Sequence, residues 1–206
     1  MLQRLGCLRP HHETARYRAT VERHALENPG LAVDCTLLLG DSLTEVFPPV
    51  LAEPRGWVVR GISGDRVRHV RARLEASVLS APCTTVAVLV GSNDLVLDRA
   101  DPAGVAREIE TLAEALESAG KRVVLTTLPP ARGRHAEANA RIRALNARLE
   151  AFRACGRRVA DLHGALANAA GELGAHYSRD GLHLAPAGYE RWAQLLRETL
   201  GAGGRR

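Results

Sequence analysis

The chain has 206 residues, of which 46% are hydrophobic and 25% are charged, and its formal net charge is +5. This length and composition fit one globular domain with a substantial core. Its apolar runs fall well short of the ~20 residues that span a membrane. The charge does not predict nucleic-acid binding, because 28 basic residues are dispersed among 23 acidic ones, with only two Trp, three Tyr and two Phe to stack on bases.

The N-terminus and the cysteines indicate where the protein works. Residues 1–9 contain no hydrophobic segment of the kind found in signal peptides, and residues 11–23 are polar, so we expect a cytoplasmic protein. The cysteines at positions 7, 35, 83 and 155 show no Cys-x-x-Cys pair and no metal-ligand spacing. Cys35 and Cys83 lie in apolar, strand-like stretches, and we expect reduced thiols.

The first thirty residues predict an N-terminal helical arm packed on a single domain, with the boundary between residues 30 and 31. Small apolar residues at helical spacing over residues 14–26 predict a helix, and the Asn-Pro-Gly sequence at 28–30 ends it. No linker or internal repeat divides residues 31–206, so we expect one domain there.

Strands and helices alternate through the rest of the chain. Short apolar runs predict strands at 36–39, 57–60, 84–90, 122–128 and 158–162. Helical spacing, caps and breakers predict helices at 43–46, 67–78, 102–119, 135–152, 165–173 and 186–200. This alternation predicts an α/β fold, with a parallel sheet covered by helices on both faces.

Polar and glycine clusters follow three of the predicted strands, at residues 40–42, 61–65 and 91–94. The carboxyl ends of parallel strands lie at one edge of the sheet, where ligand sites of open α/β folds are found. A fourth cluster, residues 180–183, precedes the last helix and can reach the same edge. The sequence therefore predicts one site built from four segments.

Ser42 is the candidate nucleophile within these clusters. Gly40 allows a sharp turn after the first strand, and a hydroxyl at the strand-to-helix junction lies close to unpaired helix N–H groups. Helix capping by Asp41 or Ser42 is the simpler explanation of this stretch when it is taken alone. The four clusters together supply a serine, a histidine, a carboxylate, glycine N–H groups and a carboxamide, which is the inventory that acyl transfer needs.

The four clusters resemble the sequence blocks of the SGNH hydrolases, also called the GDSL family. The blocks are residues 40–43 (Gly-Asp-Ser-Leu), 61–65, 91–94 and 180–183, and they occur in the family's order. The resemblance implies a flavodoxin-like three-layer α/β/α sandwich with a five-stranded parallel sheet. Residues 61–74 and the N-terminal helix are similar to the catalytic subunits of platelet-activating-factor acetylhydrolase and their bacterial relatives.

The same resemblance assigns roles to individual residues. Ser42 is expected to be the nucleophile, His183 the general base and Asp180 the carboxylate that orients it. The N–H groups of Ser42 and Gly64 and the side-chain amide of Asn93 are expected to form the oxyanion hole.

Residues next to these expected site residues are interpreted separately. Many relatives carry an asparagine shortly before the Gly64 block, where this chain has Val59 and Arg60, so a supporting hydrogen bond near the hole is in question. We expect Asp65 to cap the helix at 67–78 and Asp41 to support the turn.

The combined interpretation is a serine esterase that hydrolyses short-chain, acetyl-type O-esters through an acyl-enzyme on Ser42. Short strand-end loops leave almost no residues for a lid, and the flanking residues Thr44, Ser63 and Ser92 are small and polar. The expected partner is a small-molecule ester substrate, and the existence of a homodimer is left open.

Four alternatives stay open at this stage. The same acyl-enzyme serves a thioesterase, a lysophospholipase or an acyltransferase, since only substrate and acceptor differ. A non-catalytic flavodoxin-like module with a vestigial serine is a further alternative. We expect no cofactor and no metal, because His163, Asp161 and His176 lack the spacing of His-rich metal motifs.

Overall fold

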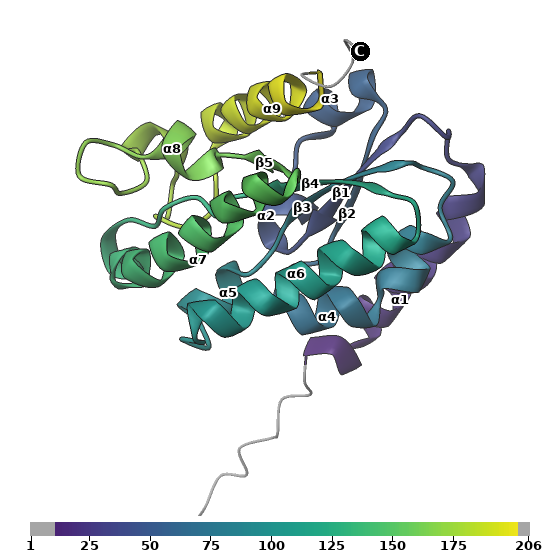
Figure 1. The fold of residues 1–206 in the computed structure, drawn as a ribbon, viewed down its shortest axis with the longest axis horizontal. Coiled ribbons are helices and arrows are strands. Elements are labelled where there is room, and N and C mark those ends of the chain that lie inside the picture. The colour runs from purple at the N-terminus through teal and green to yellow at the C-terminus, as the bar shows by residue number, and fades with distance from the viewer. Residues whose placement is uncertain (1–10, 202–206) are drawn as a thin grey trace, which may run out of the picture.

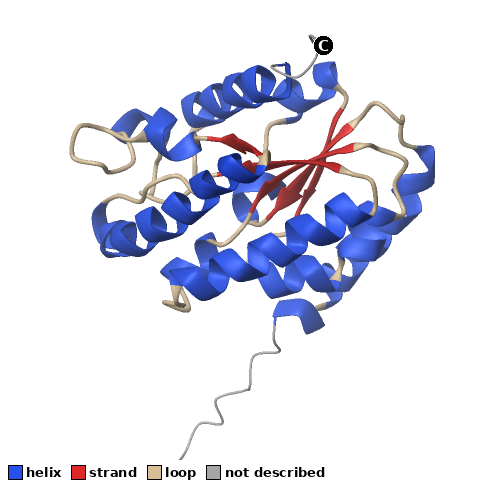
Figure 2. Cartoon of the chain, in the orientation of Figure 1, coloured by secondary structure: helices blue, strands red, loops and turns tan. Residues whose placement is uncertain are grey.

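The computed structural model describes residues 11–201 as five parallel strands and the helices that cover them (Figures 1 and 2). The strand order in the sheet is β2-β1-β3-β4-β5. The strands are β1 (Thr36–Gly40), β2 (Trp57–Gly61), β3 (Thr85–Leu89), β4 (Arg122–Thr126) and β5 (Arg158–Ala160). The predicted α/β fold with a five-stranded parallel sheet is confirmed.

Helices cover both faces of this sheet. The helices are α1 (Ala15–Glu27), α2 (Ser42–Glu45), α3 (Pro49–Ala52), α4 (Val67–Ala72), α5 (Ser92–Val96), α6 (Pro102–Ser118), α7 (Asn139–Ala151), α8 (Leu162–Leu166) and α9 (Pro186–Gly201). Helices α3 and α9 pack together on one face, whereas α4, α6 and α7 pack side by side on the other (Figure 1). Helix α1 packs against a π-helical turn, η4 (Glu75–Leu79), beyond α4. Among the described residues, no helix is both long and apolar enough to cross a membrane.

The core lies on both sides of the central strands. Every residue of β1 and β3 is buried, as expected for parallel strands that are covered on both faces. The bulky aromatic side chains are also in the core: the Phe47 ring lies 5.1 Å from that of Trp192 and 5.6 Å from that of Tyr189. Phe47, Trp192 and Tyr189 therefore fix α9 on the sheet.

Three predicted helices differ from the observed ones. The helix predicted at 135–152 begins with a 3₁₀ segment, η5 (Gly133–Ala138), and the α-helix itself starts at Asn139. The helix predicted at 165–173 is wrong: α8 begins at Leu162, because the Asp161 side chain accepts the N–H of Gly164 at 2.9 Å and caps it there. A β-bridge between Ala167 and Leu173 follows it. The helix predicted at 67–78 is α4 followed by the π-helical turn η4.

The expectation of four reduced cysteines is also wrong. Cys35 and Cys83 stand just before β1 and β3, which are neighbours in the sheet. Their Cα atoms are 5.2 Å apart, within the range that a disulfide needs, and the structure joins them in one. Their sequence positions alone could not show that the two strands are adjacent. Cys155 is a free, exposed thiol, and Cys7 lies outside the described residues.

Candidate active site

Ser42 is the first residue of α2, directly beyond the end of β1. Gly40 ends that strand, and a Cβ atom on it would lie 2.1 Å from the carbonyl oxygen of Leu89, so only glycine fits there. Asp41 then caps α2, since its Oδ1 accepts the N–H of Leu43 at 3.0 Å. The predicted role of Asp41 as a turn residue is therefore confirmed, and Ser42 is held at the carboxyl edge of the sheet.

The turn before α9 brings a histidine and a carboxylate to this serine. His183 Nε2 lies 3.3 Å from Ser42 Oγ, and His183 Nδ1 lies 2.7 Å from Asp180 Oδ2. With the Nδ1 proton donated to Asp180, the Nε2 lone pair faces the serine hydroxyl. The structure thus brings Ser42, His183 and Asp180 into one hydrogen-bonded chain.

Short-range hydrogen bonds shape the turn that carries His183. Ser178 Oγ donates to the carbonyl of His183 at 2.7 Å and accepts the N–H of Gly181 at 2.9 Å. Gly181 has φ +86°, and a Cβ on it would meet the carbonyl oxygen of Arg132 at 2.4 Å. The Arg132 N–H donates to the Gly181 carbonyl at 2.8 Å, which ties this turn to the segment after β4.

Asp180 is held as a carboxylate. Partial burial opposes ionisation, but hydrogen bonds from the His183 ring and from the N–H groups of Leu182 and His183 prevail, and the pKa of Asp180 lies well below its usual range. The side chains of His183 and Asp180 are 47% and 44% exposed, so this part of the site is open to solvent.

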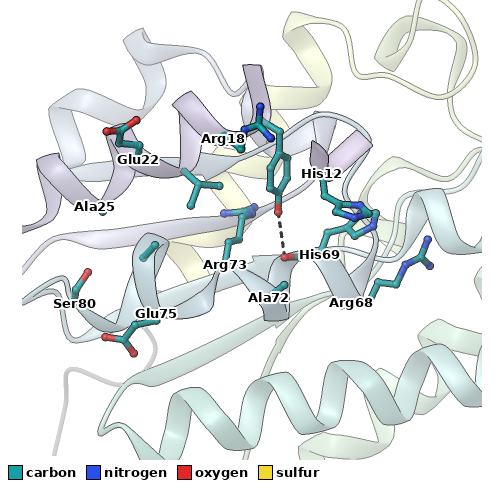
Figure 3. Close-up of a pocket in the computed structure, with 13 residues that line it drawn as sticks. His12, Arg18, Glu22, Ala25, Arg68, His69, Ala72, Arg73, Glu75 and Ser80 are labelled. Atoms are coloured by element: carbon teal, nitrogen blue, oxygen red, sulfur yellow. Dashed lines mark hydrogen bonds between the residues drawn. The ribbon is translucent and has the colours of Figure 1, made fainter. Parts of the chain in front are cut away.

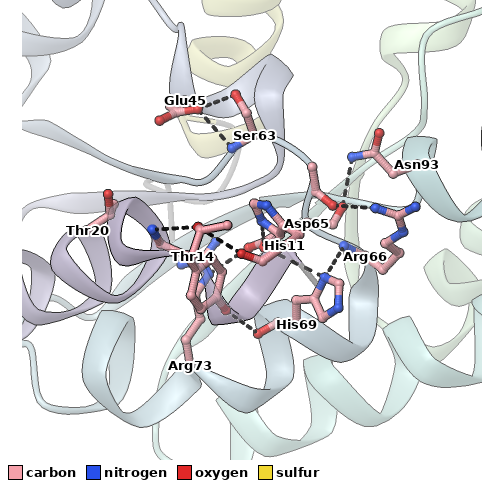
Figure 4. Close-up of polar contacts among 12 residues, drawn as sticks. His11, Thr14, Thr20, Glu45, Ser63, Asp65, Arg66, His69, Arg73 and Asn93 are labelled. Carbon is pink, nitrogen blue, oxygen red and sulfur yellow. Dashed lines mark hydrogen bonds and ion pairs between the residues drawn. The ribbon is translucent and has the colours of Figure 1, made fainter. Parts of the chain in front are cut away.

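Gly64 and Asn93, the other predicted members of the site, lie on two neighbouring segments that are joined to each other. Gly64 has φ +87°, and Gly91, which precedes α5, has φ +118°. Asn93 is almost fully buried, and its Nδ2 donates to the backbone carbonyl of Asp65 at 2.9 Å (Figure 4). That bond uses one of the two Nδ2 protons and fixes the amide next to Gly64.

A buried ion pair lies beneath these segments. The Asp65 and Arg73 side chains are 0% and 1% exposed, and Arg73 Nε donates to Asp65 Oδ2 at 2.8 Å. Arg73 Nη2 also donates to the carbonyl of Gly40 at 3.0 Å. Burial raises the pKa of Asp65 against the opposing pull of the Arg73 guanidinium. This pair connects the segments that carry Ser42, Gly64 and Asn93.

The prediction that Asp65 caps the following helix is wrong. The cap of α4 is Arg66, which forms a capping box with His69, and the Arg66 N–H donates to His69 Nδ1 at 3.2 Å. The Asp65 side chain turns inward to Arg73 instead. A carboxylate just before a helix is the usual sequence sign of a cap, and no local feature distinguishes it from an inward-facing ion pair.

The N-terminal arm contacts the Gly64 segment directly, which sequence reasoning missed. His11 Nε2 lies 3.2 Å from Asp65 Oδ1, and a Cβ on Gly64 would be 3.2 Å from His11 Nδ1. On α2, Glu45 accepts the N–H of Ser63 at 2.8 Å and pairs with Arg16 of α1 (Figure 4). Helix α1 and the residues before it therefore brace this segment from outside.

Arg60, near the position where many relatives are expected to carry an asparagine, bonds to the end of α1. Its side chain is 1% exposed, with Nη1 donating to Glu27 at 2.9 Å and Nη2 to Asn28 at 3.0 Å. It therefore anchors the end of α1 to β2. No sequence signal pairs Arg60 with residues some thirty positions earlier.

One group has the composition of a metal site. Within residues 11–201, ligand atoms of His11, Asp65 and His69 lie within 4.8 Å of one another, whereas His163, Asp161 and His176 form no such group. A cation there would have to displace the His11–Asp65 bond and the N–H bond to His69, next to the Arg73 guanidinium. The hydrogen-bond network accounts for this group without a metal.

The comparisons with known proteins agree with this architecture. The model of the GDSL-like lipase/acylhydrolase family matches residues 38–191. The chain therefore belongs to this family, and the protein is a hydrolase of the GDSL type. A search of the curated proteins finds no significant match.

Solved structures show the same fold. A GDSL-like lipase from Bacteroides thetaiotaomicron is 24% identical, with a TM-score of 0.80 over 89% of this chain and 98% of that one. A protein described as a platelet-activating factor, from Streptococcus pneumonia, is 21% identical, with a TM-score of 0.79 over 89% and 92%. A catalytic mutant of an acetylxylan esterase from Geobacillus stearothermophilus is 17% identical, with a TM-score of 0.66 over 83% and 95%.

Proposed function

We propose that the protein is a serine esterase that cleaves short-chain acyl O-esters through an acyl-enzyme on Ser42. The observation that carries this proposal is the continuous hydrogen-bonded chain from Ser42 Oγ through the His183 ring to Asp180. A serine hydroxyl becomes a competent nucleophile when an adjacent imidazole takes its proton, and a carboxylate behind the ring stabilises the resulting imidazolium.

Acylation follows from this geometry. His183 Nε2 removes the proton from Ser42 Oγ as that oxygen attacks the ester carbonyl, and Asp180 balances the charge that develops on the ring. The imidazolium then protonates the leaving alcohol as the tetrahedral intermediate collapses. Because Asp180 already accepts three hydrogen bonds, it remains ionised through this step.

The negative charge on the tetrahedral oxygen needs donors that are already in place. We assign this role to the N–H groups of Ser42 and Gly64 and to the Nδ2 proton of Asn93 that does not bond to Asp65. The Arg73–Asp65 pair acts as a positioning element, since it connects the segments that carry all three donors.

Deacylation reverses these proton transfers, with water as the acceptor activated by His183. An alcohol or sugar in place of water would give an acyltransferase, and a thiol leaving group would give a thioesterase. These alternatives use the same residues, so the substrate and not the site separates them.

Two features support a preference for short acyl groups. The His183 and Asp180 side chains are nearly half exposed, which fits a shallow site. The large aromatic side chains Phe47, Tyr189 and Trp192 are packed in the core and are not available as walls of an acyl tunnel. The acetylxylan esterase with the same fold acts on acetyl esters, which is in keeping with this proposal.

A series of p-nitrophenyl esters from acetate to decanoate tests the proposal. We expect kcat/KM to be highest for acetate to butyrate and then to fall or level off, with a Ser42→Ala variant as the blank. A buried methylene contributes ~0.8 kcal/mol, roughly fourfold in kcat/KM. A steady increase toward decanoate would contradict the short-chain proposal and favour a lysophospholipase or thioesterase.

A further inference from the structure

A groove runs along the surface where helix α1 meets the segment formed by α4 and η4. Its volume is about 940 Å³, near the upper end of the range for small-molecule sites. Small or apolar residues line both of its sides: Val21 and Ala25 on α1, and Ala72 and Ala76 on the segment of α4 and η4 (Ala25 and Ala72 are labelled in Figure 3). Val21, Ala25 and Ala76 are half-buried, so the groove has an apolar floor.

The two ends of the groove differ in charge. Arg18, Arg68 and Arg73 gather with His69 at one end, whereas Glu22 and Glu75 stand near the other (Figure 3). Arg18 and Arg68 are exposed at the rim. An elongated ligand would therefore meet positive charge at one end and hydrocarbon along its length.

Arg73 provides the second observation, because its donors are not all used. Nε and Nη2 donate to Asp65 and Gly40, but among the described residues Nη1 is buried without an acceptor. The residue is 2% exposed, and its side chain lines the groove together with Tyr17 of α1 (Arg73 is labelled in Figure 3). A buried donor without an acceptor is costly, and a carboxylate at this end of the groove would satisfy it.

We propose that this groove binds a single-chain alkyl carboxylate. Its head group would lie at the Arg18 and Arg73 end, toward Arg73 Nη1. Its alkyl chain would lie on Val21, Ala25 and Ala76. This ligand site is separate from Ser42, and it does not depend on the proposed esterase activity.

The length of the groove indicates the length of the chain. Tyr17 and Ala25 line it eight residues apart on α1, which corresponds to about 12 Å along the helix axis. Medium-chain carboxylates such as decanoate match this span, whereas acetate leaves the apolar floor uncovered. Each methylene buried on that floor should tighten binding about fourfold.

Isothermal titration calorimetry on the Ser42→Ala variant tests the proposal without turnover. We expect decanoate to bind at one site, with octanoate about sixteenfold weaker because it lacks two methylenes. Acetate and decyltrimethylammonium, which carries the opposite charge on the same tail, should not bind measurably. Decanoate should be used below its micelle concentration.

Paired variants locate the site. Ala25→Glu places a charge on the apolar floor and should abolish decanoate binding, whereas Ala19→Glu, exposed on the same helix outside the groove, should leave it unchanged. Arg18→Glu should weaken binding about fivefold or more. Arg148→Glu, an exposed arginine on α7, is its matched control. Thermal unfolding of each variant shows whether it is folded.

Four results would overturn the proposal. Two of them are binding of decanoate no tighter than that of acetate, and binding of the cationic detergent as tight as that of decanoate. Binding that is equally strong in folded Ala25→Glu and Ala19→Glu would place the ligand elsewhere. Binding to anionic phospholipid vesicles without binding to free decanoate would mean that the groove meets a lipid surface and not a free carboxylate.

Discussion

The two halves of the candidate site are built in different ways. Asp180 and His183 lie on a half-exposed turn that is held mainly by bonds between residues two to five positions apart, with one long-range bond from Arg132 to Gly181. The oxyanion segments rest instead on the buried Asp65–Arg73 pair, which joins segments far apart in the sequence. The proposed general base is therefore positioned mainly by a local turn, whereas the proposed oxyanion hole is positioned by the core.

This difference predicts how each half responds to mutation. A change in the exposed turn should alter the chemistry and leave the fold intact, because few core contacts depend on it. A change in the buried network should alter both the rate and the stability, since it leaves a charge unpaired in the core. The following variants separate the two effects.

The largest effect is expected for Ser42→Ala. Loss of the nucleophile should reduce ester hydrolysis by several orders of magnitude, because the hydrogen-bonded chain then has nothing to activate. The melting temperature should stay close to that of the wild type. Activity above about one percent of the wild-type value would contradict the assignment of Ser42.

Asn93→Ala should have the next largest effect. Removal of one oxyanion donor should lower kcat by roughly 10² to 10³ with little change in KM, because this donor acts mainly in the transition state. Steady-state kinetics on p-nitrophenyl acetate measures both constants. An unchanged kcat would show that Asn93 only forms a turn.

Arg73→Met tests the buried half of the comparison. We expect about 3–5 kcal/mol lower unfolding free energy, because Asp65 is left buried without its partner. We also expect a fall in kcat with KM nearly unchanged. If Arg73→Met does not fold, Arg73→Lys is the alternative variant, and it should retain part of the wild-type rate. Arg122→Met is the control, because Arg122 lies at the amino end of β4, opposite the carboxyl edge that carries Ser42. Loss of stability with full kcat would mean that the pair does not position the hole.

Asp41→Asn has the smallest expected effect and depends on pH. Burial raises the pKa of Asp41 to about 7 from its usual 3.8, against the hydrogen bond from Leu43, and its Oδ2 has no partner among the described residues. Because the folded-state pKa is raised, the contribution of this carboxyl is complete below about pH 4 and is lost as pH rises to about 7. The wild type should therefore lose stability relative to Asp41→Asn across that window, by on the order of 4 kcal/mol. Urea unfolding at several pH values measures it, and a constant difference would contradict the pKa shift.

Much of the fold and of the exposed half could be predicted from the sequence. Apolar runs mark the five strands, and the Asp-Gly-Leu-His sequence at 180–183 carries its own short-range bonds. The buried half could not be predicted. Asp65 looks like a helix cap and Arg73 like a helix-surface arginine, because only the folded chain brings them to Gly40 and Asn93. The contact of His11 with the Gly64 segment and the pairing of Cys35 with Cys83 could not be predicted either, because in both cases only folding brings the two residues together.

Covalent labelling with a fluorophosphonate tests most directly whether Ser42 is an activated nucleophile, since only an activated serine reacts with this reagent rapidly. Intact-mass spectrometry of the wild-type protein should show one adduct, and peptide mapping should place it on Ser42. His183→Ala should slow the labelling by several orders of magnitude. Asn139→Ala is not a suitable control, because the Asn139 side chain bonds to the backbone of Ala131 in the core. The exposed Arg148→Glu variant should label like the wild type. No adduct, or an adduct on another residue, would contradict the account.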